Sequence, residues 1–166
     1  MTDYYTNFSF LVVLADTAQH DYALHRFLQM SAIRQGEDIP PDFPAQLIEA
    51  SEDCCFEADA DGPHAIWLHS HSGGVDGVCA FVQHLIQKFN LNPVSFEWSH
   101  DCSKPRTDAY GGGAAYITAR DIQTLSTEIR RVRADQKVPP SRPLPARIAL
   151  DAGHPDAAGL AAAARV

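Results

Sequence analysis

The stretch HAIWLHSHSGGVDGVCAFVQHLIQKFN, residues 64–90, carries the clearest structural signal in the chain. Its first part, residues 64–72, is expected to pair with residues 54–60 as a β-hairpin, because the intervening Asp61-Gly62-Pro63 is an Asp-Gly turn signal. Its second part, residues 75–90, predicts the strongest helix, since the apolar positions follow one face of a 3.6-residue period. Those positions are Val75, Val78, Val82, Leu85, Ile86 and Phe89.

Towards the N-terminus, the pattern predicts a strand and then a helix. Residues 4–14 are rich in aromatic and β-branched residues and place Phe8, Phe10 and Val12 on one face. Asp16 or Thr17 can cap a helix that extends to about Met30. Its expected inner stripe is Tyr22, His25 and either Leu28 or Phe27. Residues 35–44 contain three prolines and predict a loop, followed by a short helix over residues 45–50.

Towards the C-terminus, two further strands and a last helix are expected. Pro93 opens a strand to about His100, and a connection over residues 103–113 leads to a strand over residues 114–118. Thr118-x-x-Asp121 resembles a capping box and predicts a helix to about Arg133. Its inward residues would be Ile122, Leu125, Ile129 and Val132, with Arg130, Arg131 and Arg133 outward.

The order of elements is therefore β-α-(short α)-β-β-α-β-β-α. This predicts an α+β fold in which two or three helices pack on one face of a mainly antiparallel sheet. The first six main elements match the ferredoxin-like β-α-β-β-α-β order, with an extra strand and a C-terminal helix. Such a fold hosts many unrelated functions, so function has to be argued from a site.

The chain divides by composition near residue 134. Residues 135–166 contain five prolines, many alanines and no aromatic residue, so they offer little to bury. We expect residues 1–134 to form a single domain and residues 135–166 to be a flexible tail rich in alanine and proline.

Charge is unevenly distributed along the 166 residues, whose net charge is −8. Residues 1–100 carry 14 acidic and three basic residues, whereas residues 101–166 carry seven acidic and ten basic residues. An acidic chain is a poor candidate for direct nucleic-acid binding, which needs clustered Lys and Arg. The candidate contact residues for a protein partner are the eight acids between positions 38 and 61, namely Asp38, Asp42, Glu49, Glu52, Asp53, Glu57, Asp59 and Asp61.

Cysteine usage and hydropathy predict a cytoplasmic protein. Cys54, Cys55, Cys79 and Cys102 have no framework spacing, so reduced thiols are expected. The first residues lack a basic export region, and no stretch approaches the roughly 20 apolar residues that span a bilayer. A homodimer is compatible with the sequence.

Coordinating side chains gather at two predicted strand ends. His69 and His71 share one face of their strand, and His100 and Cys102 share one face of another. If these strands are neighbours, the four residues could hold zinc, which prefers imidazole and thiolate ligands. Three ligands and a bound water would then make a metal-dependent hydrolase built on His69, His100 and Cys102. The competing interpretation is that each histidine has a separate structural role.

Three other segments allow alternative interpretations. Lys104 and Arg106 could activate Cys102 as a nucleophile with His100 as its base. Gly111, Gly112 and Gly113 lack the helix that follows a phosphate-binding loop, so a bulged turn or a close approach of backbones is expected instead. Arg130, Arg131 and Arg133 could serve a DNA-binding regulator, although arginines at a helix C-terminus also complement the helix dipole.

Four segments together resemble a family of small uncharacterised proteins of bacterial plasmids, phages and integrative elements. They are YTNFSF (residues 5–10), WLHS (67–70), FEWSHDCSKPR (96–106) and YGGGA (110–114). The resemblance covers roughly residues 4–127 and is most specific in the Cys-Ser-Lys-Pro-Arg and triple-glycine stretches. It implies a mobile-element context and assigns no catalytic role to any residue.

This resemblance and the acidic first hundred residues favour a small interaction protein without enzymatic activity. The expected role is counter-defence, by anti-CRISPR or antirestriction action, in which carboxylates occupy a host protein surface where phosphates would bind. The metal-dependent hydrolase and the DNA-binding regulator remain the alternatives.

Overall fold

The computed structural model describes residues 3–104 and 110–127. The chain divides into two units, Met1–Arg131 and Val132–Val166, and every described residue belongs to the first. The predicted flexible tail and the C-terminal part of the predicted last helix lie outside the described residues, as do Arg130, Arg131 and Arg133. Among the described residues, no helix has the length and apolar character needed to span a bilayer.

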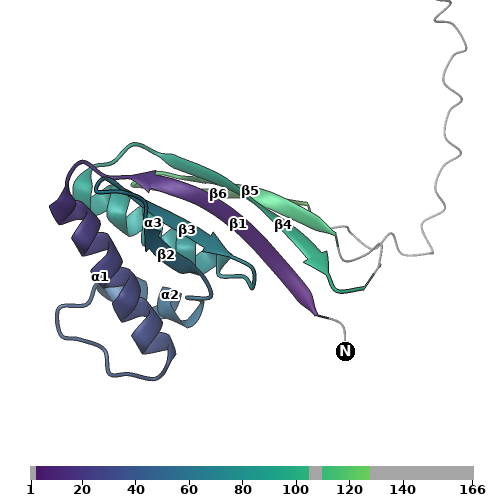
Figure 1. Cartoon of the computed structure of the whole chain (residues 1–166), viewed down its shortest axis with the longest axis horizontal. Coiled ribbons are helices and arrows are strands. Elements are labelled where there is room, and N and C mark those ends of the chain that lie inside the picture. The colour runs from purple at the N-terminus through teal and green to yellow at the C-terminus, as the bar shows by residue number, and fades with distance from the viewer. Residues whose placement is uncertain (1–2, 105–109, 128–166) are drawn as a thin grey trace, which may run out of the picture. The chain divides into compact units, whose positions relative to one another are not determined.

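Six strands form one antiparallel sheet in the order β2-β3-β1-β4-β5-β6 (Figure 1). The strands are β1 (Tyr4–Val13), β2 (Glu57–Ala60), β3 (Ala65–Ser70), β4 (Val94–Cys102), β5 (Gly111–Ile117) and β6 (Ile122–Thr127). The helices are α1 (Thr17–Arg34), a 3-10 turn η1 (Ala45–Leu47), α2 (Ile48–Glu52) and α3 (Val75–Phe89). The predicted α+β class, with helices on one face of an antiparallel sheet, is confirmed. The order of the first four strands is that of a split β-α-β arrangement.

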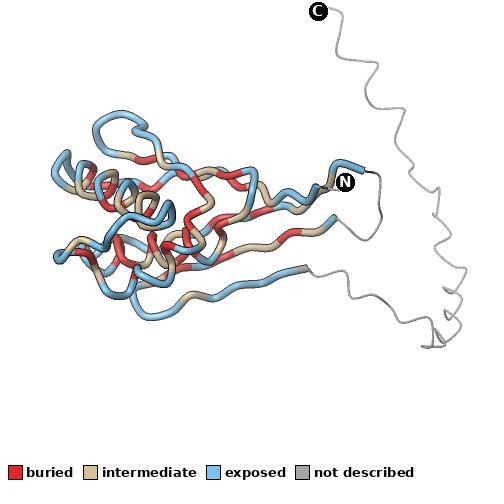
Figure 2. The backbone as a smooth tube through the Cα atoms, turned by 90° about the horizontal axis from the view of Figure 1, so that it is seen from below, coloured by how far each residue is buried: buried red, intermediate tan, exposed pale blue. Residues whose placement is uncertain are grey.

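The core lies between the sheet and the helices, and β1 shows why. Phe8 and Val12 are buried, whereas Leu11 and Val13 between and beyond them are exposed, as expected from strand alternation. Phe10 shares the inner side and stacks on Phe96 of β4, with ring centroids 4.3 Å apart. Figure 2 shows buried residues recurring along the central strands and the inner sides of the helices.

Helix α1 begins as predicted but faces the core differently. The Asp16 carboxylate accepts a hydrogen bond from the Gln19 N–H, 2.8 Å away, which caps the first turn. Ala23, Arg26 and Met30 are buried, and Tyr22 and Phe27 of the predicted stripe pack against the core. His25 and Leu28 are exposed, so that part of the predicted stripe is wrong. Arg26 misled the prediction because a charged residue is rarely buried unless it is paired.

Helix α3 matches the predicted stripe, but its N-terminal cap comes from a distant segment. Gly74 is the N-cap residue, with φ of 82°, and makes no side-chain cap hydrogen bond. Instead the Asp53 carboxylate accepts a hydrogen bond from the Gly77 N–H at 3.0 Å. A Cβ on Gly77 would overlap the Asp53 backbone, so glycine permits this close approach. A carboxylate from the end of α2 therefore caps the first turn of α3.

The triple glycine lies inside β5 and makes room for an indole ring. Gly113 pairs with Trp98 of β4, and the Trp98 side chain is buried against β5. A Cβ on Gly113 would overlap the Trp98 ring, and one on Gly112 would overlap the Trp98 carbonyl. Close approach of backbones was one of the two predicted roles, and it is the one observed. Neither glycine has a positive φ.

The last predicted helix is wrong over its described part, where β6 is found instead. Thr118 Oγ1 accepts hydrogen bonds from the N–H groups of Arg120 and Asp121, as a helix-capping residue would. The Thr118 N–H, however, donates to the Asp121 carbonyl at 2.9 Å and closes a β5–β6 hairpin. Ile122 is half-buried and Leu125 is 74 % exposed, so these two residues do not share an inward face.

We predict that Gly113→Ala lowers the free energy of unfolding by about 1–3 kcal/mol, the usual cost of overpacking a core. Glycine-to-alanine in an unobstructed strand should instead be neutral or stabilising, because alanine loses less backbone entropy on folding. Urea unfolding measures the difference, with Ala114→Ser on the opposite side of β5 as the control. An unchanged or raised midpoint for Gly113→Ala would show that the Trp98 ring does not confine this position.

Candidate functional site

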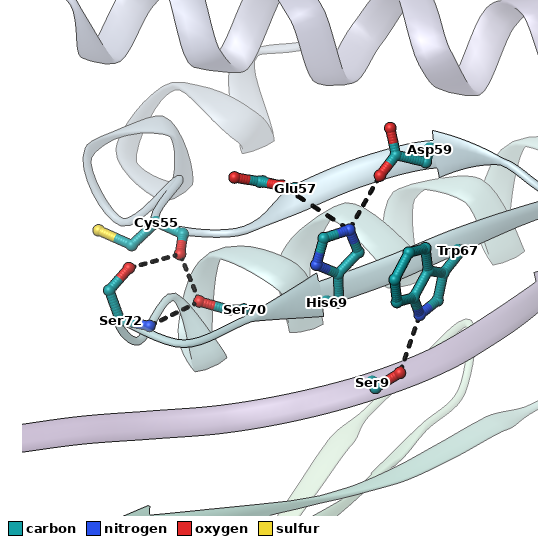
Figure 3. A network of polar contacts seen from close by, with 8 residues as sticks. All are labelled: Ser9, Cys55, Glu57, Asp59, Trp67, His69, Ser70 and Ser72. Atoms are coloured by element: carbon teal, nitrogen blue, oxygen red, sulfur yellow. Dashed lines mark hydrogen bonds and ion pairs between the residues drawn. The ribbon is translucent and has the colours of Figure 1, made fainter. Parts of the chain in front are cut away.

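A cluster of polar side chains spans β2 and β3 on the side of the sheet opposite the helices, called here the open face (Figure 3). His69 Nε2 lies 2.9 Å from Asp59 Oδ2 and 3.8 Å from Glu57 Oε2. The β2–β3 register places Glu57 directly opposite His69, and Asp59 lies two residues further on the same face. The three ligand atoms lie within 4.8 Å of one another.

Trp67 holds the imidazole of His69 in place. The two rings stack with centroids 3.8 Å apart and planes 25° apart. The Trp67 indole N–H donates to Ser9 Oγ of β1 at 2.8 Å, which orients the indole in turn. As Figure 3 shows, Trp67 and His69 lie side by side on β3, and both carboxylates reach from β2 towards the imidazole.

Hydrogen bonds of two serines close the end of this hairpin. Ser70 Oγ donates to the Cys55 carbonyl at 2.6 Å and accepts from the Ser72 N–H at 3.0 Å (Figure 3). Ser72 Oγ also donates to the Cys55 carbonyl, at 3.4 Å. These bonds satisfy backbone groups beyond the last β2–β3 pair, as buried polar groups require.

His71 belongs to a different network, which crosses β1. Its Nδ1 lies 2.8 Å from Asn7 Oδ1, and the Asn7 amide donates to Asp101 of β4 at 3.3 Å. Asn7 accepts through its oxygen and donates through its nitrogen, so His71 donates through Nδ1. His71 and His69 therefore have separate partners.

His100 lies on the helix side of the sheet, and its two ring nitrogens are both engaged. The Trp98 indole N–H, which can only donate, bonds to His100 Nε2 at 3.2 Å. His100 Nδ1 then carries the proton and lies 2.9 Å from Thr6 Oγ1. Both ring nitrogens thus have hydrogen-bond partners, which leaves His100 no free nitrogen for a metal.

The predicted set of His69, His71, His100 and Cys102 does not come together. Strand β1 lies between β3 and β4, so the two histidine-bearing strand ends are not neighbours. The first two residues lie on the open face and the last two on the helix side. Cys102 Sγ bonds to the Lys104 carbonyl, and His100 is engaged elsewhere, so no Cys-His nucleophile pair is formed either.

The charged residues of the described strands are all acidic. They are Glu57, Asp59, Glu97 and Asp101, and all four lie on the open face by strand alternation. Exposed apolar residues of the same face are Tyr5, Leu11, Val13, Trp67, Tyr116 and Leu125. The open face thus combines carboxylates with aromatic and aliphatic side chains and, within the described strands, bears neither Lys nor Arg.

The eight acids predicted as contact residues occupy different environments. Asp42 forms an ion pair with Arg26 at 2.9 Å, and this hydrogen-bonded guanidinium lowers the pKa of Asp42. Asp53 caps α3, and Asp59 bonds to His69. The exposed Asp38, Glu49, Glu52 and Asp61 lie in loops or on α2. Of these four, Asp61 follows β2 directly and lies in the wall of a hollow beside Trp67 on the open face.

The predicted loop residues separate as well. Lys104 is exposed after β4, while Gly111, Gly112 and Gly113 belong to β5. Arg106 lies outside the described residues, as do the three arginines of the proposed DNA-binding helix.

A groove of about 660 Å³ adjoins the His69 cluster. Its lining includes Glu57, His69, His71 and Ser72 from the hairpin, and Ser31 and Arg34 from α1. A second hollow of about 550 Å³ lies beside Trp67, with Ser9, Leu11 and Asp61 in its wall. Both give small groups access to the open-face side chains of β3.

The sequence analysis named Glu57 and Asp59 only as contact residues for a protein partner, and it missed both their placement beside His69 and the role of Asn7. Equal steps from the predicted turn Asp61-Gly62-Pro63 would pair Glu57 with Trp67, whereas the observed register is centred on Pro63 and pairs Glu57 with His69. Asn7 and Asp101 needed the strand order, which no local pattern contains.

A buried histidine between the helices is a structural residue. His84 Nε2 lies 2.8 Å from the Tyr22 hydroxyl, and the Gln46 amide donates to His84 Nδ1 at 2.8 Å. Burial lowers the pKa of His84 below its ordinary 6.5, and the positive charges of Lys88 and Arg26 lower that pKa further. The folded protein therefore favours the neutral imidazole.

Two of the four cysteines are inert packing residues. Burial raises the pKa of both the Cys54 and the Cys79 thiol to about 12, so neither forms a thiolate near neutral pH. All four cysteines are free.

A scan of protein-family models and searches of curated proteins and of solved structures give no match to this chain.

We predict that His84 makes stability fall as the pH drops below about 6.5. The unfolded chain binds a proton at that pH, while folded His84 does so only at lower pH, so protonation favours unfolding. Denaturant unfolding between about pH 7.5 and pH 5.5 should show a steeper loss of free energy for the natural chain than for His84→Gln. Equal slopes for the two proteins would contradict the assignment.

Proposed function

We propose that this chain is an interaction protein without enzymatic activity that binds a basic surface of another protein through the open face of its sheet. The observation that carries the proposal is the sidedness of charge. All charged residues of the described strands are carboxylates on that face, which also exposes Trp67, Tyr116 and Leu125.

The composition of the open face fits an interface. Aromatic side chains are enriched in the centres of protein interfaces and supply much of their binding energy. Trp67 is held by its bond to Ser9, so binding would cost little side-chain entropy at that position. Glu97 and Asp101 would select a partner by charge and accelerate its association.

A nucleic-acid-binding protein is the partner class that we propose. Proteins that bind nucleic acids present clustered Lys and Arg to phosphates, and an acidic face can compete for that surface. The resemblance to proteins of plasmids, phages and integrative elements supports the CRISPR or restriction machinery of a host as the partner, and counter-defence as the role.

The two alternatives have less support. A hydrolase built on His69, His100 and Cys102 would need ligands that lie on opposite sides of the sheet. A DNA-binding regulator would rely on Arg130, Arg131 and Arg133, and the described strands offer phosphates only carboxylates.

We predict that Glu97→Lys abolishes capture of the partner, because like charges placed opposite each other at an interface cost several kcal/mol. The immobilised full chain is exposed to a bacterial host lysate, and the captured protein is challenged with saturating duplex DNA. The natural chain should retain a partner that DNA displaces, and Glu97→Lys should retain at least tenfold less (about 1.4 kcal/mol).

Glu49→Lys on α2 is the matched control, since it makes the same change of charge on the helix side. It should capture the partner as the natural chain does. Equal loss in both variants would indicate a general charge effect. Retention in the presence of saturating DNA would exclude competition for a nucleic-acid site.

A further inference from the structure

The cluster of Glu57, Asp59 and His69 has the donors of a metal site. It offers one imidazole nitrogen and two carboxylate oxygens, all presented by two paired strands. Zinc takes such ligands at about 2.0–2.2 Å, so two ligands of a tetrahedral ion lie about 3.3 Å apart. The observed separations from His69 Nε2, 2.9 Å and 3.8 Å, bracket that distance.

The chemistry of the donors selects the class of ion. Mg²⁺ and Ca²⁺ prefer all-oxygen ligands, whereas imidazole favours zinc and the neighbouring divalent transition metals. The negative charges of the two carboxylates also offset the two positive charges of a divalent ion. His69 Nε2 already faces both carboxylates, so it is the nitrogen that would bind the ion.

The surroundings favour binding in two ways. Trp67 stacks on His69 and fixes the plane of the imidazole, so little side-chain freedom remains to be lost there. The Glu57 and Asp59 side chains are 75 % and 61 % exposed, so little packing would oppose a small rotation of either carboxylate towards an ion. Glu57 and His69 also line the 660 Å³ groove, which would give solvent access to a fourth coordination position.

We propose that Glu57, Asp59 and His69 form a binding site for a divalent transition-metal ion of the zinc class, with one position open to the groove. This site differs from the predicted histidine and cysteine set, of which it keeps only His69. It is independent of the proposed function, because the ion alone is sufficient to test it.

The test is calorimetric titration of the full chain, purified without a histidine tag and freed of metal with a chelator, with zinc chloride. We expect saturable binding of one ion per chain and no comparable binding of magnesium. His69→Gln should weaken zinc binding at least tenfold, because losing even an outer-shell partner of a metal site commonly costs about 10- to 100-fold.

Glu57→Gln and Asp59→Asn should each weaken binding as well, and both change exposed side chains that the fold does not require. His71→Gln is the matched control, since His71 bonds to Asn7 on the same face and should leave zinc affinity unchanged. Absence of saturable binding, equal binding of magnesium, or an equal loss in His71→Gln would overturn the proposal. Thermal unfolding of each metal-free variant verifies that it is folded.

Discussion

Strand β1 sets how the polar side chains of β3 and β4 meet on the open face, because it is hydrogen-bonded to β3 along one edge and to β4 along the other. With both edges paired, its register is strongly specified, and a slip of one residue would exchange its two faces. Phe8 and Val12 enter the core only in this register, and Asn7 and Ser9 then point to the open face. Asn7 then bonds to His71, which follows β3, and Ser9 bonds to Trp67 of β3, so core packing also organises the open face.

The helices cover one side of the sheet, so the other side is exposed and its side chains determine the chemistry of that surface. Antiparallel sheets commonly have one solvated face, but here the charged residues that the described strands place on that face are all acidic. Glu97 and Asp101 lie on β4, and Glu57 and Asp59 lie on the β2 edge, with Trp67 between these pairs in strand order. A divalent ion held at the edge would neutralise two of the four carboxylates and leave the β4 pair unchanged. The charge on the two halves of the face can therefore vary independently.

Local patterns predicted most elements because each pattern depends on residues that are close together in the chain. The apolar period of α3 and the Asp-Gly turn of the hairpin are signals of this kind. The β6 segment was misassigned because Thr118 makes the same N–H hydrogen bonds in a hairpin turn as in a helix cap. Ile122 and Leu125 are also too few apolar residues to distinguish a helical period from the alternation of a strand.

The hypothesis of a metal site built on His69, His71, His100 and Cys102 failed for a different reason. The position of β1 between β3 and β4 is a property of the whole sheet, which no local pattern contains.

The carboxylate of Asp53 makes the first turn of α3 dependent on a segment 24 residues earlier in the chain. An excised peptide over residues 64–90 would contain the whole apolar stripe and would still lack the acceptor for the Gly77 N–H. Such a peptide should fray from its N-terminal end, even though it carries the strongest helical signal in the chain. During folding, α3 can elongate locally, but its start is completed only when the α2–β2 connection has docked. The first turn of α3 and the α2–β2 connection must therefore reach their final structure together.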